Sequence, residues 1–309
     1  MPQALSNATS GGAHAGRTRP EPAAPRARGA AKAARIAASV LGALAAGPLL
    51  APGANAAAAK RPVCAAGESS SGPSARIVGM APDGSLLLQD GRRFVPDGIV
   101  LPTRLEPVNG LTEAAARAAT DAVGGREITF SRVGTDRHGR LTGAARMTGA
   151  DDAGADIAAR LVAAGAAYAS ADGACAPSLV ADEHAARAAR RGLWARPGAI
   201  APAGDEEEMG RRLGLHAVAE GRIKAVGGRR ETTYLNFGEI WRRDFTVLVP
   251  TGDFAIIFGH GAGSGHDPDT LRGERVRVRG VVREQGGPAI MVRSPAGIER
   301  LGERAGSEE

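Results

Sequence analysis

The sequence predicts an α+β protein with two folded domains. Short strand-like segments separated by glycine turns come first along the chain, and helix-like segments follow them. The second half contains further short strands and little helical pattern. Of the 309 residues, a predicted leader takes 56, and the remaining 253 are long for one domain and sufficient for two.

Residues 1–56 have the pattern of a secretory signal peptide. A basic lead precedes an apolar run over residues 36–50, and Ala54-Asn-Ala56 puts small residues at a cleavage site. The alternative is an uncleaved membrane anchor, but the run is short for a bilayer span and is interrupted by Gly47 and Pro48. We therefore expect a periplasmic or secreted protein with no transmembrane segment after cleavage.

The charge balance does not predict a nucleic-acid partner for the molecule as a whole. The chain has 39 basic and 33 acidic residues, and six of the basic and one of the acidic residues lie in the leader. Beyond the leader, 33 basic residues face 32 acidic ones, a net charge of +1. Binding to polyanions is therefore expected only from local patches.

Both cysteines, Cys64 and Cys175, lie in the exported part. An oxidising compartment permits a disulfide between them, and the even count leaves no odd thiol. The alternative is two separate thiols. Two cysteines this far apart make a poor metal site.

The first domain is expected over residues 75–197, after an N-terminal segment at 57–74. Its strands are predicted at 75–79, 85–89, 92–95, 126–133 and 141–147. Turn-forming sequences such as Asp90-Gly91 separate them. Helices are predicted at 111–123, at 156–164, and from a Ser178 cap to a stop at Gly192, with Glu183 and Arg187 paired at i,i+4.

The second domain is expected over residues 216–303, followed by a tail at 304–309. Residues 198–215 are interpreted as a linker because proline, glycine and an acidic run dominate them, with a short helix over 209–215. Strands are predicted at 219–226, 231–237, 245–249, 275–282 and 289–292, and one helical turn at 269–272. Five strands separated by glycine turns suggest a barrel like the oligonucleotide-binding (OB) fold.

Three stretches of the first domain carry a family resemblance: Asp90–Thr103, Asp136–Arg140 and Ala186–Trp194. Their order and spacing resemble the staphylococcal nuclease (thermonuclease) family over about residues 76–197. The resemblance implies a five-stranded OB-type barrel with three helices. It also implies hydrolysis of phosphodiester bonds with a bound cation such as calcium.

The residues that carry this chemistry are replaced. On the resemblance, the family's two metal aspartates fall on Gly84 and Val100, its first phosphate arginine on Val95 and its catalytic glutamate on Thr103. None of these side chains can hold a hard cation, clamp a phosphate or act as a base near neutral pH.

Only Arg140 matches a phosphate contact of the family, and the alternative, a structural role in its turn, is favoured over a residual phosphate contact. Loss of activity is therefore expected. The alternative is a relocated metal site built from Asp83, Asp97 and Glu106, which are otherwise interpreted as solvated turn residues.

The second domain contains aromatic residues interleaved with arginines. Tyr234, Trp241, Arg242 and Arg243 suit stacking on unpaired bases, whereas Phe237, Phe245 and Phe258 are more typical of a barrel core. Arg275, Arg277 and Arg279 alternate with valines and share one face of a strand, which is either a binding surface or a solvated face.

We therefore predict a binding or interaction module without a cofactor. Its partner is single-stranded nucleic acid, an envelope protein or a glycan. The alternatives are a nuclease with a relocated site, which would need a divalent cation, and a structural envelope protein.

Overall fold

The computed structural model describes residues 72–102, 110–148, 154–240, 242–259 and 268–302. All of them belong to one compact unit, Ala56–Glu309. The predicted leader and the N-terminal segment up to residue 71 lie outside the described residues. Within the described ranges, no helix combines the length and the apolar character that a membrane crossing requires.

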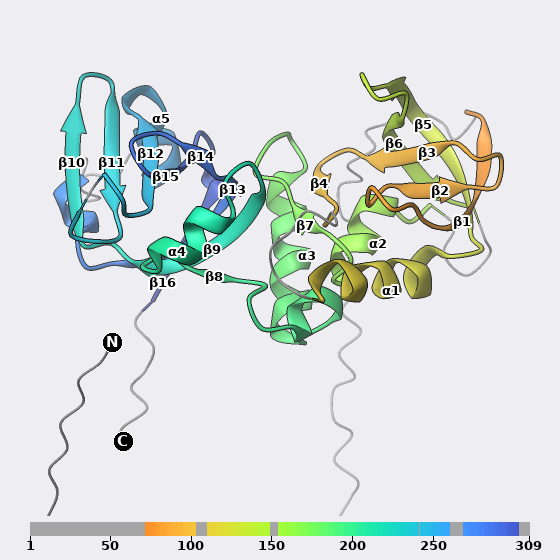
Figure 1. Ribbon diagram of the computed structural model, residues 1–309. Coiled ribbons are helices and arrows are strands. Elements are labelled where there is room, and N and C mark those ends of the chain that lie inside the picture. The colour runs from red at the N-terminus through yellow and green to blue at the C-terminus, as the bar shows by residue number, and fades with distance from the viewer. Residues whose placement is uncertain (1–71, 103–109, 149–153, 241, 260–267, 303–309) are drawn as a thin grey trace, which may run out of the picture. The chain divides into compact units, whose positions relative to one another are not determined.

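The first domain contains a closed five-stranded barrel with strand order β1-β2-β3-β6-β5 (Figure 1). Its strands are β1 (Ser74–Met80), β2 (Leu86–Leu88), β3 (Arg93–Pro96), β5 (Glu127–Thr135) and β6 (Leu141–Met147). The first three form an antiparallel meander, and β3 pairs in parallel with β6. The OB-type barrel that the sequence predicted is thus confirmed.

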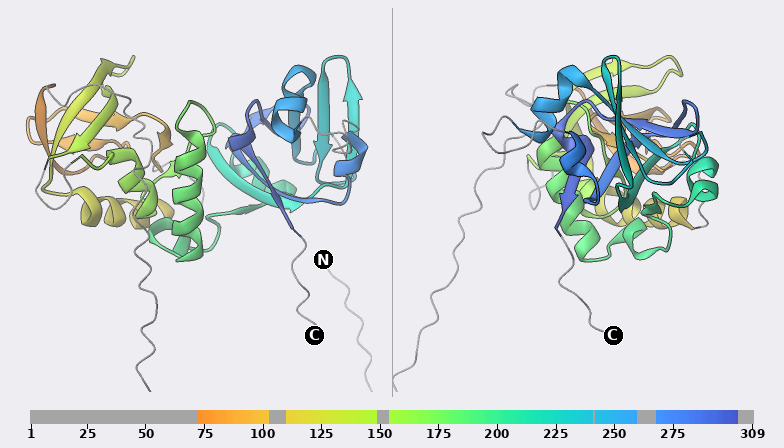
Figure 2. Two further views of the ribbon diagram at one scale, coloured as in Figure 1. Left: turned by 180° about the vertical axis from the view of Figure 1, so that it is seen from behind. Right: turned by 90° about the vertical axis from the view of Figure 1, so that its left-hand side faces the viewer.

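Three helices cover one end of this barrel, as both Figure 1 and the view from behind in Figure 2 show. They are α1 (Leu111–Val123), α2 (Ile157–Ala163) and α3 (Ala176–Ala188), and a 3-10 turn, η1 (Gly192–Ala195), follows α3. The predicted span of the first helix is confirmed. The side chain of Asp156 caps α2 by accepting hydrogen bonds from the backbone N–H groups of Ala158 and Ala159.

The predicted Ser178 cap is wrong, because α3 begins two residues earlier, at Ala176. The hydroxyl of Ser178 instead donates to the carbonyl of Cys175 at 3.0 Å, inside the first turn. Pro177 sits at the helix start, where a missing N–H costs no hydrogen bond. At the other end, α3 stops at Ala188, before Gly192.

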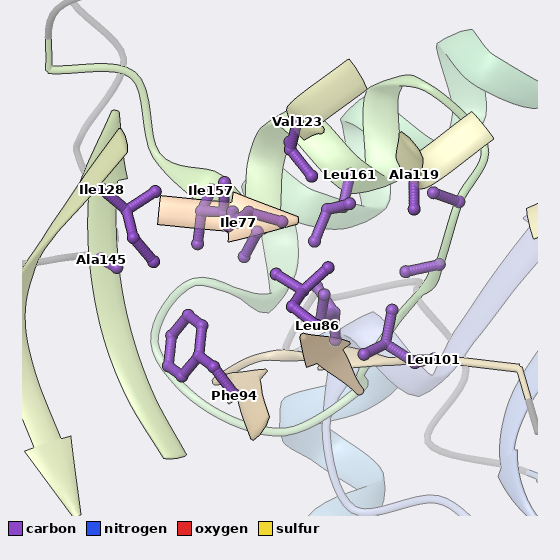
Figure 3. Packing of buried hydrophobic residues seen from close by; sticks show 14 of the residues in the cluster. Ile77, Leu86, Phe94, Leu101, Ala119, Val123, Ile128, Ala145, Ile157 and Leu161 are labelled. Atoms are coloured by element: carbon purple, nitrogen blue, oxygen red, sulfur yellow. The ribbon is translucent and has the colours of Figure 1, made fainter. Parts of the chain in front are cut away.

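The barrel and its helices share one core. Figure 3 shows Ile77, Leu86, Phe94, Ile128 and Leu161 pointing into the same interior, and all five are at most 1% exposed. The rings of Phe94 and Phe130 meet edge to face at 5.0 Å. A two-stranded sheet of β4 (Ile99–Val100) and β7 (Tyr168–Ala169) lies beside this core and pairs Val100 with Tyr168.

The strands of the second domain form two sheets, β10-β11-β12-β15-β14 and β16-β13-β9-β8. The elements are β9 (His216–Arg222), β10 (Ala225–Arg229), β11 (Thr232–Asn236), β12 (Thr246–Pro250), α5 (Thr251–Phe258), η2 (Pro268–Leu271), β13 (Arg275–Val281), β14 (Arg283–Glu284), β15 (Pro288–Met291), η3 (Pro295–Gly297) and β16 (Ile298–Leu301). The β-rich character is as predicted.

The two sheets are joined where the chain bends between β9 and β10 and between β13 and β14. Only Ile223 and Lys224 separate β9 from β10. The N–H of Ile223 donates to the carbonyl of Glu274, and the N–H of Lys224 donates to the carbonyl of Asn236 in the other sheet. Val282 alone separates β13 from β14. The strand predicted over 219–226 is therefore two strands. The third strand, β12, pairs in parallel with β15, just as β3 pairs with β6 in the first barrel.

Residues 198–215 are not a simple linker. They contain β8 (Ala201–Pro202), which pairs in parallel with β9, and α4 (Glu206–Arg211). The predicted helix over 209–215 therefore begins and ends earlier. Ala201, Ala203 and Met209 belong to the second core, together with residues such as Phe245 and Ile290. Burial of small alanines explains why a stretch rich in turn-forming residues is ordered.

Candidate functional site

The structure gives a reason for the residues at two of the replaced positions. Gly84 has a φ of +82°, and a Cβ added there would lie 2.6 Å from the carbonyl oxygen of Pro102. An aspartate at this position would therefore be strained as well as crowded. Val95 is half-buried on β3, and Thr103 lies outside the described residues.

Val100 is half-buried and lies partly against apolar side chains. It packs on a buried cluster that includes Tyr168 and Trp194 from the first domain and Val218 from β9. An ionised aspartate at this position would lose hydration, and apolar neighbours would not replace it. Val100, where the resemblance would place a metal ligand, thus packs on a cluster that contains residues of both domains.

Asp83, the neighbour of Gly84, belongs to a group of two carboxylates and two guanidinium groups. We call this group the remnant cluster, and it consists of Asp83, Arg93, Asp136 and Arg140. Asp83 Oδ2 accepts a hydrogen bond from Arg93 Nη1 at 2.9 Å and lies 3.6 Å from Arg140 Nη1. Arg140 Nε donates to Asp136 Oδ2 at 2.8 Å. Arg93 is the first residue of β3 and Arg140 directly precedes β6, and β3 and β6 pair at Phe94 and Leu141, which brings both arginines near Asp83.

Asp136 is fixed by its own turn. Its Oδ1 accepts hydrogen bonds from the backbone N–H groups of His138 at 2.8 Å and Arg140 at 3.0 Å. Burial alone would raise the pKa of Asp136, but these bonds and the Arg140 guanidinium outweigh it and lower the pKa to about 2. The Asp-x-x-Gly-Arg motif therefore makes a self-contained turn that holds the Arg140 side chain.

Asp83 is likewise an ion-pair partner. Burial acts to raise its pKa, but hydrogen bonds from Ser85 and the charges of Arg93 and Arg140 bring the pKa below its ordinary value. Asp97 pairs with Arg132 on β5, a different partner on a different strand. These carboxylates therefore face separate arginines and do not converge on one point.

The donor set that a calcium ion needs is missing from the described residues. No group of three or more His, Cys, Asp or Glu side chains in those residues could hold a metal ion. Calcium takes six to eight oxygen ligands, whereas Asp83 and Asp136 are already bound to guanidinium groups. Glu106, the third residue of the alternative metal site, lies outside the described residues, as does Thr103.

A second charged group, the buried cluster, was not predicted as a unit. It consists of Glu183, Arg187, Glu220, Arg277, Arg279 and Glu299. The predicted pair of Glu183 and Arg187 is confirmed at 2.5 Å. Glu183 Oε1 also accepts from Arg279 Nη1 on β13 at 2.6 Å, and both side chains are at most 1% exposed.

Glu299 completes the buried cluster. Its carboxylate accepts hydrogen bonds from Arg187, Arg277 and Arg279. Burial would raise its pKa, but the three guanidinium charges lower it below the ordinary value. Three arginines and three glutamates therefore pair where α3 meets the sheet of β9, β13 and β16, and Arg275, which also pairs with Glu220, adds one positive charge at the edge of this cluster.

The arginine stripe on β13 is therefore not a solvated or nucleic-acid-binding face. Arg275 and Arg277 pair with Glu220 on β9, and Arg279 pairs with Glu183 and Glu299. The alternation correctly predicted that the three arginines share one face. Their partners are distant in sequence, so the sequence did not show that this face is turned inward.

The aromatic residues expected to stack on bases have mixed surroundings. Tyr234 on β11 is half-buried, and Trp241 lies outside the described residues. Arg242 and Arg243 are both exposed, and Arg243 makes two 2.9 Å hydrogen bonds to Glu206. The single-strand interface therefore stays a prediction.

The remaining aromatic residues are structural. Phe237 and Phe245 are buried in the second core with ring centroids 5.3 Å apart, as predicted, and Phe258 packs against that core. In the first domain, Trp194 packs edge-on against Tyr168 at 5.5 Å, and Arg187 lies 5.6 Å over its ring. The last sequence block, which ends at Trp194, thus holds the helices and the buried cluster together.

Cys175, at the start of α3, is disulfide-bonded. Cys64 lies outside the described residues, so the pairing of Cys64 with Cys175 stays a prediction. Such a bridge would tie the N-terminal segment to α3.

The comparison with protein families confirms the resemblance that the three sequence blocks predicted. Residues 102–196 match the family model described as staphylococcal nuclease homologue. The matched region contains Arg140 and the Trp194 block and begins after Gly84, Val95 and Val100. No curated protein matches the chain.

Proposed function

We propose that this chain is an exported thermonuclease-like protein that has lost phosphodiesterase activity and acts as a binding or interaction module. The observation that carries the proposal is the remnant cluster. Both of its carboxylates are bound to arginines, in the region where a nuclease would hold a cation.

The chemistry of hydrolysis makes this arrangement unfavourable for cleavage. A metal-dependent nuclease needs carboxylates free to bind a cation, a base to activate water and cations to stabilise the developing phosphoryl charge. In the described residues, the carboxylates of Asp83 and Asp136 form ion pairs with Arg93 and Arg140, respectively. Val100 cannot act as a ligand and packs among apolar side chains.

Retention of the fold supports an interaction role. If β9 with β10 and β13 with β14 are each counted as one bent strand, the two domains have the same strand order, with the third strand paired in parallel with the fifth. Surfaces of this fold serve many binding functions. Single-stranded nucleic acid is one candidate partner, bound through Tyr234, Trp241, Arg242 and Arg243. An envelope protein or a glycan is the alternative partner.

The proposal that the protein is exported rests on the leader alone, and mass spectrometry of the mature N-terminus tests it.

A cleavage assay tests the loss of activity. Purified mature protein is incubated with single-stranded DNA and with RNA, in the presence of calcium, other divalent cations or a chelator. We expect no cation-dependent products, because no group of three or more His, Cys, Asp or Glu side chains in the described residues could hold a metal ion.

The same assay discriminates the relocated-site alternative. Asp83→Ala and Asp97→Ala variants are compared with an Asp172→Ala control, which changes an exposed aspartate outside the remnant cluster. Robust cleavage that is lost in Asp83→Ala or Asp97→Ala and kept in the control would replace the proposal with a metal-dependent nuclease.

A further inference from the structure

A groove lies on the helical side of the first domain, outside the remnant cluster. Residues of α1, α2 and η1 line a hollow of about 770 Å³. Its floor consists of short side chains, mainly Ala114, Ala118, Ala122, Ala163 and Ala164. Because alanine carries only a methyl group, the groove is left open between the helices.

The rim of this groove is strongly basic. Four exposed arginines, Arg117, Arg160, Arg191 and Arg196, line it together with one acidic residue, Asp121. The lining therefore carries four positive charges and one negative charge, whereas the chain beyond the leader is almost neutral. This local concentration of like charge opposes folding slightly and attracts an anionic partner.

Two contacts hold arginines at the rim. Arg191 Nη1 donates to the carbonyl of Ala163 at 3.2 Å, which ties its side chain to the end of α2. The guanidinium of Arg196 lies close to Gly110, the residue before α1. A Cβ atom added to Gly110 would be only 2.5 Å from Arg196 Nη2. Guanidinium groups placed in this way present forked donors that match carboxylates.

We propose that the groove, lined by α1, α2 and η1, binds an acidic α-helix of a protein partner. The proposal names a partner class for the interaction role and therefore rests on it. Glutamates or aspartates of the helix pair with the rim arginines, and the alanine floor lets the helix axis approach closely.

The lining favours a peptide over a single-stranded nucleic acid. Among the described residues that line the groove, none is aromatic, so the groove offers no platform on which bases stack. A floor of methyl groups between arginines suits a helix with an apolar stripe flanked by acidic side chains. Nucleic acid is therefore the competing outcome of the test.

The test uses fluorescence anisotropy with the mature protein and two labelled probes. One probe is a helical peptide with glutamates at i,i+4 spacing beside an alanine stripe, and the other is an oligo-dT strand. A peptide with glutamine in place of glutamate is the matched control. We expect saturable binding of the acidic peptide that weakens as salt is raised, and little binding of the glutamine peptide.

Charge reversal locates the site. In Arg117→Glu/Arg196→Glu, we expect the affinity for the acidic peptide to fall at least about tenfold. The matched control is Arg229→Glu/Arg283→Glu, which reverses two exposed arginines of the second domain and should leave the affinity unchanged. Unaltered thermal unfolding shows that each variant is folded.

Three results would overturn the inference: no peptide binding at low salt, equal binding of the glutamine peptide, or equal losses in both charge-reversal variants. Binding of oligo-dT that depends on Arg117 and Arg196, without peptide binding, would assign the groove to nucleic acid. The cleavage assay tests the proposed loss of activity independently of peptide binding. Cation-dependent cleavage would refute the proposed loss of activity whatever the peptide does.

Discussion

The remnant cluster and the buried cluster are made of the same chemistry in different surroundings. Both alternate arginines with carboxylates, and both neutralise their own charge. In the remnant cluster, the side chains of Arg93 and Asp83 are 42% and 31% exposed, whereas those of Arg279 and Glu183 in the buried cluster are 1% and 0% exposed. Water therefore screens the Arg93–Asp83 pair and is excluded from the Arg279–Glu183 pair, whereas Glu299, at the margin of the buried cluster, is 20% exposed.

This difference predicts different roles. An exposed ion pair contributes about 0–1 kcal/mol, because water competes with it and salt screens it. A buried pair contributes little net stability compared with apolar packing, but removal of one partner leaves an uncompensated charge. We therefore expect the buried cluster to fix how the second barrel meets α3, and the remnant cluster to fix only local side-chain positions.

The largest effect is expected from Glu183→Gln. This change removes the negative charge that Arg187 and Arg279 share, and it leaves a neutral amide that can still accept a hydrogen bond from Ala169. The free energy of unfolding should fall by about 3–5 kcal/mol. Urea denaturation followed by tryptophan fluorescence measures it.

The control for Glu183→Gln is Glu207→Gln, which breaks the pair with Arg211 on α4, where Glu207 is 83% exposed. Its effect should stay below about 1 kcal/mol. Equal losses in the two variants would remove the distinction between buried and exposed clusters.

The next effect concerns Val100, which touches the second barrel. Val100→Asp puts an ionised group among Tyr168, Trp194 and Val218 and should destabilise the protein by roughly 2–3 kcal/mol. It should also leave calcium-dependent cleavage absent, because one added carboxylate does not supply a metal site. Val100→Thr, which keeps the shape of the side chain, is the control. Cleavage in Val100→Asp would show that this position still serves catalysis.

A smaller effect is expected from His216, which lies beside the buried cluster. Both of its ring nitrogens are buried and have no hydrogen-bond partner within the part of the chain that the structure describes. Burial, reinforced by the charge of Arg279, lowers its pKa from 6.5 to about 3. The histidine is therefore neutral in the folded protein down to acidic pH.

The sign of the pH dependence follows from that lowered pKa. Between about pH 6.5 and 3, the unfolded chain binds a proton at His216 that the folded chain does not, so stability falls as pH falls through this window. The loss between pH 6.5 and 5 should be about 2 kcal/mol. His216→Phe should remove that part of the dependence in urea titrations. An unchanged slope in the variant would show that His216 is accessible to solvent.

The sequence predicted the first domain well because its information is local. Glycine turns and helix signals predicted the strands and the span of α1, and the Asp136 turn and the Trp194 block indicated the resemblance that the family model matches over residues 102–196. The bend between β9 and β10 was missed because neither Ile223 nor Lys224 is a turn-forming residue. The order in residues 198–215 was missed because burial of small alanines leaves no periodic signal.

The assignment of replaced positions to Gly84, Val95, Val100 and Thr103 stays a prediction, and the pairing of the remaining charges could not be predicted from the sequence. The resemblance placed an arginine of the family on Val95, whereas Arg93, two residues earlier on the same face of β3, contacts Asp83. Likewise, the alternation of arginine and valine predicted that Arg279 lies on the same face of its strand as Arg275 and Arg277. Its partner Glu183 lies 96 residues away, a separation at which no sequence pattern indicates contact.

The smallest effect on stability is expected from the remnant cluster. Asp83→Asn removes one half-buried carboxylate, whose side chain is 31% exposed, and should change the free energy of unfolding by less than about 1 kcal/mol. It also frees Arg93 from its pair and leaves Arg140 held by Asp136 alone, so the site gains a net positive charge. Inorganic phosphate should then shift the Arg93 and Arg140 side-chain signals in NMR spectra of the variant and leave those of the wild type unchanged. Asp97→Asn, which frees Arg132 elsewhere on the barrel, is the control and should show no phosphate-dependent shift at Arg93. If wild type and Asp83→Asn respond alike, Asp83 does not compete with anions, and the remnant cluster is as rigid as the buried one despite its exposure.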